Sequence, residues 1–273
     1  MRYRYGDSKK EFLMLIDFHT HCFPHKIAAR AMESLSNESA LVPPLNGTLE
    51  ELQRGMDEGN VKLSVVLGIA TNPHQQAAVN NYAAELNNNP NLVAFGSVHP
   101  FSDDYKYYVD FLCDNGIKGM KFQPFYQDFY VNDKQALKVY EYIASKGMVL
   151  FFHSGVDLLV KGDFCSPKKV REVLDSLKYP KTVLAHMGGW GYGEEYFELV
   201  VGSDCYLDVS FSYRYEDENT RAKFMQKHST DKILFATDRP WTDAKTDIDL
   251  VKQLPNDLSE KILYKNAKKL LGI

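Results

Sequence analysis

Short apolar runs alternate with longer amphipathic segments along the whole chain. Runs rich in Val, Ile, Leu and Phe are typical of buried parallel strands, whereas apolar residues three or four positions apart are typical of helices. The predicted strands cover 12–21, 61–69, 92–98, 117–123, 148–153, 182–187, 205–211 and 232–238. The predicted helices cover 26–36, 48–58, 74–88, 103–113, 133–146, 166–178, 194–201, 218–227, 243–253 and 259–271.

Each of the eight predicted strands is followed by helix, and no linker or low-complexity segment divides the chain. Eight repeats in about 260 residues favour a closed barrel over an open doubly wound sheet. No Gly-x-Gly-x-x-Gly follows the first strand and no Walker-type loop occurs, so nucleotide-binding folds lose their main support. We therefore predict an α/β fold, a single (β/α)8 TIM barrel over 1–273, with 1–11 as an N-terminal extension.

Composition narrows the class of protein. The apolar share is 44%, the charged share 25% and the net charge −4, without a Lys/Arg cluster, which argues against binding to nucleic acid or an anionic membrane. No apolar run reaches the roughly 18 residues of a membrane span. The four cysteines are far apart and the N-terminus does not resemble a signal peptide, so we expect a cytoplasmic protein. We expect a small-molecule substrate, and a homodimer stays open.

Histidines gather at the carboxyl ends of the predicted strands, where barrel enzymes carry their chemistry. The first strand ends in Asp17-Phe18-His19-Thr20-His21, and alternation along a strand would turn Asp17, His19 and His21 to one side. Asp238 ends the eighth strand. Five of the eight histidines lie at such ends: His19, His21, His99, His153 and His186. This set predicts a metal site, although each histidine alone fits a hydrogen-bonded core residue equally well.

The same alternation assigns the faces of the other strands. An inward His153 makes Phe151 inward and leaves Phe152 facing the helices. On the fourth strand, Lys121 and Gln123 would face the barrel axis. On the seventh strand, the pattern predicts that Tyr206, Asp208 and Ser210 point inward and that Leu207, Val209 and Phe211 point outward.

Three imidazoles and a carboxylate suit zinc, at about 2.0 to 2.2 Å, with one position open to water. The candidate metal-site residues are His19, His21, His153, His186 and Asp238. A bound divalent ion lowers the pKa of water from about 15.7 to about 7, and Asp238 would accept the proton and pass it to a leaving group. His186 would polarise a substrate carbonyl or carboxylate. Asp17 would either support the neighbouring histidines or be a polar residue at the end of the core.

Residues just beyond the strand ends are candidates for the substrate pocket. Aromatic side chains there would wall a pocket for a small organic ligand or serve as loop packing. Arg214 and Arg239 would bind a substrate carboxylate bidentately or form structural salt bridges. The candidate substrate-binding residues are Lys121, Gln123, Phe125, Tyr126, Trp190 and Arg239, with Trp241 as a further wall.

Four motifs in barrel order resemble those of the amidohydrolase superfamily, most closely the amidohydrolase-related branch of the aminocarboxymuconate-semialdehyde decarboxylase-like enzymes. These are Asp17-Phe18-His19-Thr20-His21, His153, His186-Met187-Gly188-Gly189 and Ala236-Thr237-Asp238-Arg239-Pro240-Trp241. The resemblance implies a distorted (β/α)8 barrel with one divalent metal ion, usually zinc, with Mn²⁺ as the alternative. By position, His19, His21, His153 and Asp238 would be its ligands, and His186 would be catalytic or adjacent to the metal.

Other members of that superfamily hold two metal ions bridged by a carboxylated lysine. Lys121 lies on the corresponding strand, so this arrangement stays open beside a role in binding substrate. Many relatives carry Lys-x-His-Pro there, whereas this chain has Lys121-Phe122-Gln123-Pro124. This departure weakens any direct transfer of substrate specificity.

The resemblance implies two reactions. The leading hypothesis is hydrolysis of an amide, ester or lactone of a small organic substrate by metal-activated water. The alternative is zinc-dependent, non-oxidative decarboxylation of a small carboxylic acid, although decarboxylases of this branch tend to be longer.

Three further classes fit less well. A TatD-like nuclease fits Thr237-Asp238-x-Pro240 but would have glutamate where this chain has Lys121. A phosphoesterase of the histidinol-phosphatase type would need more acidic and histidine ligands. The completeness of the candidate ligand set argues against a non-catalytic metal-binding protein.

Overall fold

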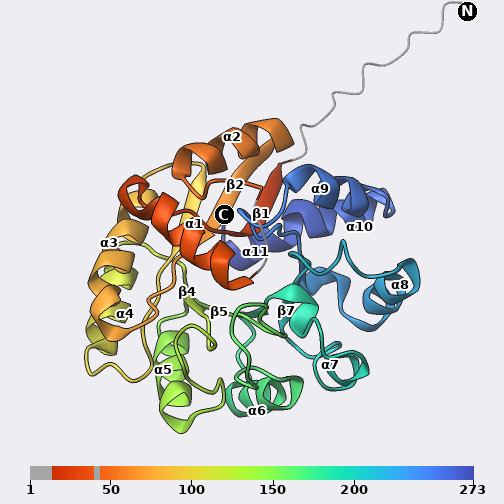
Figure 1. Cartoon of the computed structure of the whole chain (residues 1–273). Coiled ribbons are helices and arrows are strands. Elements are labelled where there is room, and N and C mark those ends of the chain that lie inside the picture. Colours follow the sequence, from red (N-terminus) through yellow and green to blue (C-terminus); the bar gives the residue numbers. More distant parts are fainter. Residues whose placement is uncertain (1–13, 40–43) are drawn as a thin grey trace, which may run out of the picture.

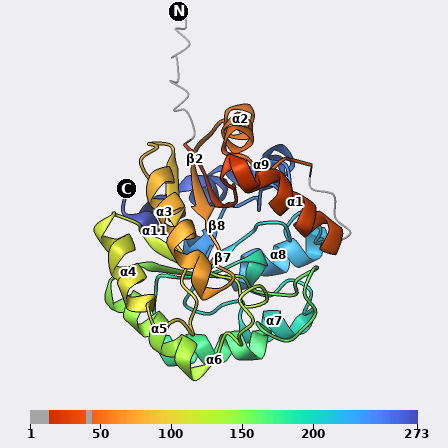
Figure 2. The same cartoon turned by 60° about the vertical axis from the view of Figure 1, so that its left-hand side comes forward.

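Parallel strands surround a central axis and helices cover their outer side (Figures 1 and 2). The computed structural model describes residues 14–39 and 44–273, with the side chains of 37–39 left out. The predicted extension 1–11 and the start of the first predicted strand lie outside the described residues. The strands are β1 (Leu15–Thr20), β2 (Val61–Leu67), β3 (Leu92–Phe95), β4 (Gly119–Phe122), β5 (Val149–Phe152), β6 (Thr182–Leu184), β7 (Tyr206–Asp208) and β8 (Ile233–Leu234).

The helices follow the strands in the predicted alternation. They are α1 (His25–Ser39), α2 (Leu49–Gly59), α3 (Gln76–Leu86), α4 (Tyr105–Asp114), α5 (Lys134–Ser145), α6 (Pro167–Leu177), α7 (Glu194–Leu199), α8 (Glu218–Lys227), α9 (Ala244–Lys252), α10 (Asn256–Glu260) and α11 (Asn266–Leu271). Helices α10 and α11 are joined by a π-helical segment, Lys261–Lys265, where the sequence predicts one regular helix. Three short 3₁₀ turns, Pro73–Gln75, His186–Gly188 and Thr230–Lys232, complete the elements.

Hydrogen bonds close the strands into a ring. Regular pairing gives two parallel sheets, β1-β2-β3 and β4-β5-β6-β7-β8. Bonds at both seams then join the sheets: Gly96 N–H to Gly119 O (3.0 Å), Lys121 N–H to Gly96 O (2.8 Å), Phe18 N–H to Phe235 O (2.9 Å), Asp238 N–H to His19 O (2.8 Å) and His21 N–H to Arg239 O (2.7 Å). The predicted TIM-barrel class is therefore confirmed.

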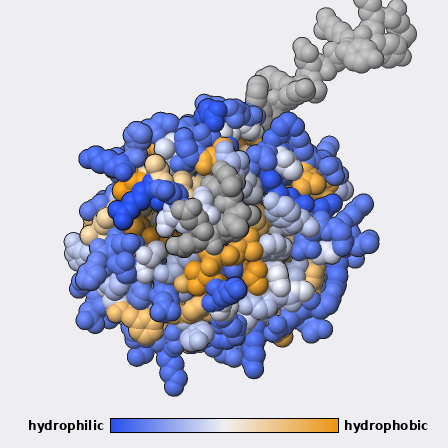
Figure 3. Space-filling view, in the orientation of Figure 1, coloured by the Kyte–Doolittle hydropathy of each residue, from blue (hydrophilic) through white to orange (hydrophobic). Residues whose placement is uncertain are grey.

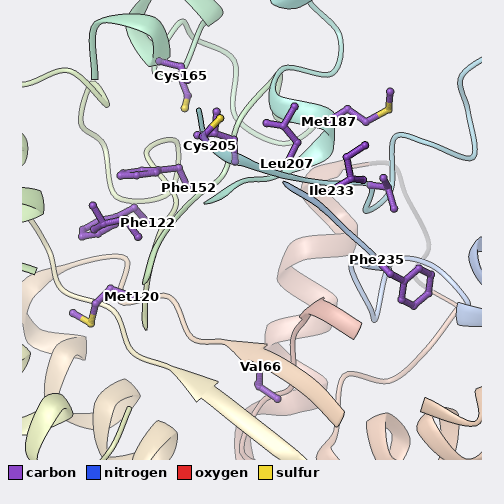
Figure 4. Close-up of a cluster of buried hydrophobic side chains, with 14 of the residues drawn as sticks. Val66, Met120, Phe122, Phe152, Cys165, Met187, Cys205, Leu207, Ile233 and Phe235 are labelled. Atoms are coloured by element: carbon purple, nitrogen blue, oxygen red, sulfur yellow. The ribbon is translucent and has the colours of Figure 1, made fainter. Parts of the chain in front are cut away.

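Alternation along the strands divides the apolar core into two layers. Val149 and Phe151 belong to the buried cluster inside the barrel, and Leu150 and Phe152 to the cluster between strands and helices. The predicted faces of β5 are therefore confirmed. Figure 4 shows members of the outer cluster, among them the stacked rings of Phe122 and Phe152, 5.6 Å between centroids. Apolar positions at every second residue thus fix which polar side chains point inward.

Three aromatic rings fill the barrel directly below the strand ends. Phe18 stacks on Phe151 at 6.2 Å and meets Phe95 edge-on at 5.9 Å. Gly119 on β4 leaves room for this cluster, because a Cβ atom there would lie 2.4 Å from the ring of Phe95. The edge-on contact of the His19 ring with Phe151, 5.0 Å between centroids, makes this layer the floor of the region where the histidines gather.

Several strands end earlier than the sequence predicts. The strand predicted over 205–211 covers Tyr206–Asp208, the one predicted over 182–187 covers Thr182–Leu184, and the last covers Ile233–Leu234 rather than 232–238. Shortly beyond these ends the backbone leaves the extended conformation, because His186, Phe211 and Asp238 adopt positive φ angles of 56°, 55° and 67°. A residue in the left-handed region cannot continue a strand. The outward prediction for Phe211 is consequently wrong, since its ring lines the central cavity.

His228, at the end of α8, ties two loops together at the rim of the fold. Its Nδ1 accepts a hydrogen bond from Gly202 N–H (3.1 Å), and its Nε2–H donates to Cys205 O (3.1 Å). The bond from Gly202 requires the neutral ring, because a protonated Nδ1 cannot accept, and burial lowers the pKa of His228 to about 4. Lys232 is the nearby cation that adds to this effect.

We predict that the unfolding free energy falls as the pH drops from about 6.5 to 4. The unfolded chain binds a proton at His228 near pH 6.5, whereas the folded protein does so only near pH 4. By pH 4 the loss from this residue is about 3 kcal/mol. Urea unfolding should show a smaller decrease for His228→Gln than for the wild type. The same decrease in both proteins would contradict the prediction, and exposed His74→Gln is the control.

Candidate metal centre and active site

Three side chains at the seam between β1 and β8 place ligand atoms around one point. His19 and His21 end β1, and Asp238 follows β8, which the seam bonds hold beside it. Asp238 Oδ1 lies 3.2 Å from His19 Nε2 and 3.2 Å from His21 Nε2, and the two Nε2 atoms are 3.2 Å apart. Two imidazole nitrogens and one carboxylate oxygen at these distances fit a shared divalent cation.

The second nitrogen of each imidazole is already engaged. His21 Nδ1–H donates to Leu67 O at 2.9 Å, which turns Nε2 toward the cavity. His19 Nδ1 lies 2.9 Å from Asp208 Oδ2, which fixes the same tautomer. Burial, and then the positive charge of Lys121, lower the pKa of His19 well below its usual value. Burial therefore keeps the His19 ring neutral, and both rings aim Nε2 at Asp238, as metal ligation requires.

Asp208 is a functional candidate that the sequence analysis placed inside the barrel but gave no role. This fully buried carboxylate holds His19 through Oδ2 and accepts the backbone N–H of His186 through Oδ1, at 2.9 Å each. Ser210 Oγ completes the group, 3.1 Å from His19 Nδ1 and 3.0 Å from His186 Nδ1. The sequence feature that could have identified it is its predicted inward position on β7. Asp17, by contrast, contacts no imidazole: it accepts bonds from Thr237 N–H and Oγ1–H and from His19 N–H.

His153 and His186 face each other on the opposite side of the cavity, 4.9 Å between ring centroids. Among the described residues, His153 Nε2 is a buried nitrogen without a hydrogen-bond partner, and the nearest carboxylate oxygen, of Asp157, is 4.0 Å away. Burial lowers the pKa of His153, which favours the neutral ring that can bind a metal ion. His186 and Asp238 both hold left-handed backbone angles, a strain that is common at functional sites.

Lys121 brings a buried amine to the same cavity. Its Nζ lies 3.5 Å from His19 Nε2 and 4.4 Å from the centroid of the Phe151 ring. Burial lowers its pKa to about 8, against the opposing effects of Asp238 and Asp208. The amine therefore lies next to Nε2 of His19, one of the candidate ligand atoms.

The cavity above these residues has a volume of about 90 Å³. Of the predicted substrate-binding residues, Gln123, Tyr126 and Trp190 line it together with Lys121, and Trp241 does so as well. The loop after β5 supplies wall residues that the sequence analysis missed, because nothing in its composition marks them: Val156, Asp157, Leu158 and Leu159. The Asp157 carboxylate holds that loop by accepting from Leu159 N–H, Val160 N–H and Gln123 Nε2–H.

Other predicted residues lie outside the cavity. Arg239 is buried in a slot against α2, where a Cβ on Gly55 would lie 1.7 Å from its guanidinium, so it packs between elements instead of facing a substrate. The Phe125 ring packs behind His153 at 5.5 Å. His99 bonds the Gln127 carbonyl at 2.9 Å. Arg214 forms salt bridges with Asp247 and Asp243.

The residues present fit a divalent metal ion. His19 Nε2, His21 Nε2 and Asp238 Oδ1 are poised as a mixed nitrogen and oxygen donor set, and the unpaired His153 Nε2 faces the same cavity. Imidazole and carboxylate donors together suit zinc and related ions, whereas magnesium and calcium prefer oxygen alone.

The family model described as Amidohydrolase matches residues 16–273 of the sequence. The chain therefore belongs to this family and is an amidohydrolase-superfamily enzyme, as its motifs predict. The family implies a divalent metal ion, and the histidine and aspartate groups are positioned to bind one. No curated protein sequence matches the chain significantly. In the part of the chain that the structure describes, no helix is long and apolar enough to cross a membrane.

Solved structures with the same fold are similar over almost the whole chain. An uncharacterised TIM-barrel protein from Bordetella bronchiseptica has a TM-score of 0.75 at 20% identity, covering 95% of this chain and 99% of its own. A 5-carboxyvanillate decarboxylase from Sphingomonas paucimobilis has a TM-score of 0.71 at 15% identity, covering 96% and 99%. A probable 2-pyrone-4,6-dicarboxylic acid hydrolase from Acinetobacter baumannii has a TM-score of 0.66 at 19% identity. The match covers 95% of this chain and 99% of the hydrolase chain.

We predict that Asp208→Asn weakens metal binding about 10- to 100-fold, the usual cost of removing the hydrogen-bond partner of a metal-ligating histidine. The amide cannot supply the negative charge that holds the Nδ1–H tautomer of His19. Titration of the metal-free protein with Zn²⁺ against a competing chelator measures the change. Asp204→Asn, at the exposed start of the same strand segment, is the matched control. Unchanged affinity in Asp208→Asn would show that Asp208 does not position His19.

Proposed function

We propose that this protein is a metal-dependent hydrolase that cleaves an amide, ester or lactone bond of a small organic substrate. The observation that carries the proposal is the position of Asp238 Oδ1, 3.2 Å from the Nε2 atoms of both His19 and His21. We propose His19, His21, His153 and Asp238 as ligands of one ion, with His186 beside it. Zinc is our first choice and Mn²⁺ the alternative, because zinc prefers imidazole nitrogen with carboxylate oxygen.

A divalent ion held there would supply an acidic water molecule, with a pKa near 7 in the best cases. Asp238 keeps a second carboxylate oxygen that would accept the proton of the attacking water and transfer it to the leaving group. His186 would polarise the substrate carbonyl from the opposite wall. The Lys121 amine, 3.5 Å from His19 Nε2, would stabilise negative charge on the carbonyl oxygen as it develops.

Decarboxylation of a small carboxylic acid is the second candidate. Lys121 is the one Lys or Arg among the described residues that line the cavity, and it would bind a single carboxylate. Trp190, Phe211 and Trp241 would wall an aromatic ring. A second metal ion is the further alternative for Lys121 and would require its carboxylation. The packing of Nζ over the Phe151 ring supports the plain amine instead.

A substrate panel with the zinc-loaded enzyme separates the two reactions. In water enriched in ¹⁸O, hydrolysis incorporates the label into the acid product. Decarboxylation releases CO2 without consuming water. Products of hydrolysis alone would exclude the second candidate, and CO2 release alone would exclude the first.

We predict that Asp238→Asn lowers kcat about 10²- to 10⁴-fold, because an amide cannot accept the proton. The amide oxygen still offers a ligand atom, so metal content, measured by mass spectrometry of the purified protein, should show retained metal. Asp249→Asn on the exposed side of α9 should retain full activity. An Asp238→Asn enzyme with bound metal and wild-type turnover would refute the proton-transfer role.

A further inference from the structure

A second cavity of about 490 Å³ lies beside the metal centre, between α1, β2 and α3. We call it the α1–α3 cavity. Helix α1 crosses the face on which the strands end, and α3 borders that face (Figure 1). Figure 3 shows this face as mainly hydrophilic, with apolar patches near its centre. The α1–α3 cavity is more than five times as large as the 90 Å³ cavity above the candidate ligands.

The walls of the α1–α3 cavity are apolar. Helix α1 contributes one face, with Ile27, Ala31 and Leu35 spaced four residues apart, and α3 contributes a face that includes Ala78 and Val79. None of the described residues that line it is Lys, Arg, Asp or Glu. Two amphipathic helices thus turn apolar faces toward a space that neither fills. Ile27 is 50% exposed, so this space opens to the surface.

The two cavities share part of their walls. His21, Ile69 and Tyr126 line both of them. The His21 ring stands at the boundary, with Nε2 turned to Asp238 and Nδ1–H bonded to Leu67 O. These three side chains form the partition between the cavities, so a substrate that occupied both would have to pass Ile69 and Tyr126.

The sizes of the cavities limit the substrate. The 90 Å³ cavity lies well below the usual size of a small-molecule site, which suits the reacting group better than a whole substrate. Small-molecule sites usually measure about 300 to 1,000 Å³ and are mostly apolar, which describes the α1–α3 cavity. A charged occupant would lose its hydration there without gaining an ionic partner.

We propose that the α1–α3 cavity binds an uncharged alkyl or arylalkyl arm of the substrate whose reacting group lies at the metal centre. This inference rests on the proposed hydrolase function and adds a substrate class, namely amides, esters or lactones with an apolar arm of several carbons. Contact of that arm with Ile69 and Tyr126 would position the scissile bond next to Asp238. Chain length would then determine specificity.

Binding of a neutral fluorescent probe, N-phenyl-1-naphthylamine, tests the cavity without any reaction. Ala31→Phe and Ala78→Phe place a ring in the cavity from opposite helices and should weaken probe binding at least tenfold. The matched controls, Ala29→Phe and Ala77→Phe, lie on the same helices at exposed positions outside the cavity and should bind as the wild type does. Octan-1-ol should displace the probe.

Equal affinity in all four variants would overturn the proposal, because the probe would then bind elsewhere. Absence of probe binding would overturn it as well, as expected if another segment of this chain or a second copy fills the space. Circular dichroism of each variant confirms that a loss of binding does not reflect unfolding.

Kinetics with the zinc-loaded enzyme links the cavity to catalysis. Across p-nitrophenyl esters from acetate to decanoate, kcat/KM should rise about fourfold per added methylene group until the cavity is full. The rise should be absent in Ala31→Phe and present in Ala29→Phe. Probe binding without ester hydrolysis would count against the hydrolase function and leave the cavity assignment intact. If the wild type hydrolyses all the esters equally well whatever their chain length, the hydrolase function stands and the cavity assignment is wrong.

Discussion

The backbone bonds between β1 and the segment after β8 hold the candidate centre together. Phe18 N–H to Phe235 O, Asp238 N–H to His19 O and His21 N–H to Arg239 O bring residues more than two hundred positions apart into one plane. Asp17 reinforces the same seam by accepting two bonds from Thr237. Because His19, His21 and Asp238 belong to this seam, closing the barrel also brings three of the four proposed ligands together. A change that opens the seam would therefore remove the metal centre as well as the fold.

The layer beneath the centre determines how its polar groups behave. The rings of Phe18, Phe95 and Phe151 exclude water from below, so the His19 imidazole above them loses hydration and stays neutral. The same desolvation raises the pKa of Asp208 and lowers that of Lys121. Neutral imidazoles are the form that binds metal. A hydrophobic floor and a network that fixes the tautomers thus prepare the site before an ion arrives.

Alternation and strand ends predicted much of this arrangement. The two-residue period correctly separated Phe151 from Phe152, and the histidines and Asp238 gathered where parallel strands end. The two-residue period does not predict side-chain direction where the backbone leaves the strand. Phe211 is the example: its φ angle is positive, and its ring lines the cavity although the period predicts that it points outward. The sequence left the role of Arg239 open between substrate binding and structure, because only the packing of α2 shows that Gly55 leaves space for the guanidinium. Contacts between helices and loops have no local pattern in the sequence.

Two adjoining cavities of opposite character would, on our proposals, divide the tasks of recognition and reaction. The small cavity holds the charged and titratable groups, namely His19, His21, His153, Asp238 and Lys121, whereas the larger one has no Lys, Arg, Asp or Glu among its described lining residues. Electrostatic attraction to a bound ion would act on the carbonyl group, which all such substrates share, and would distinguish them poorly. Burial of apolar surface is weaker per atom yet grows with each methylene group. A substrate that reaches across Ile69 and Tyr126 would combine both, so its length, rather than its charge, would distinguish it from smaller competitors.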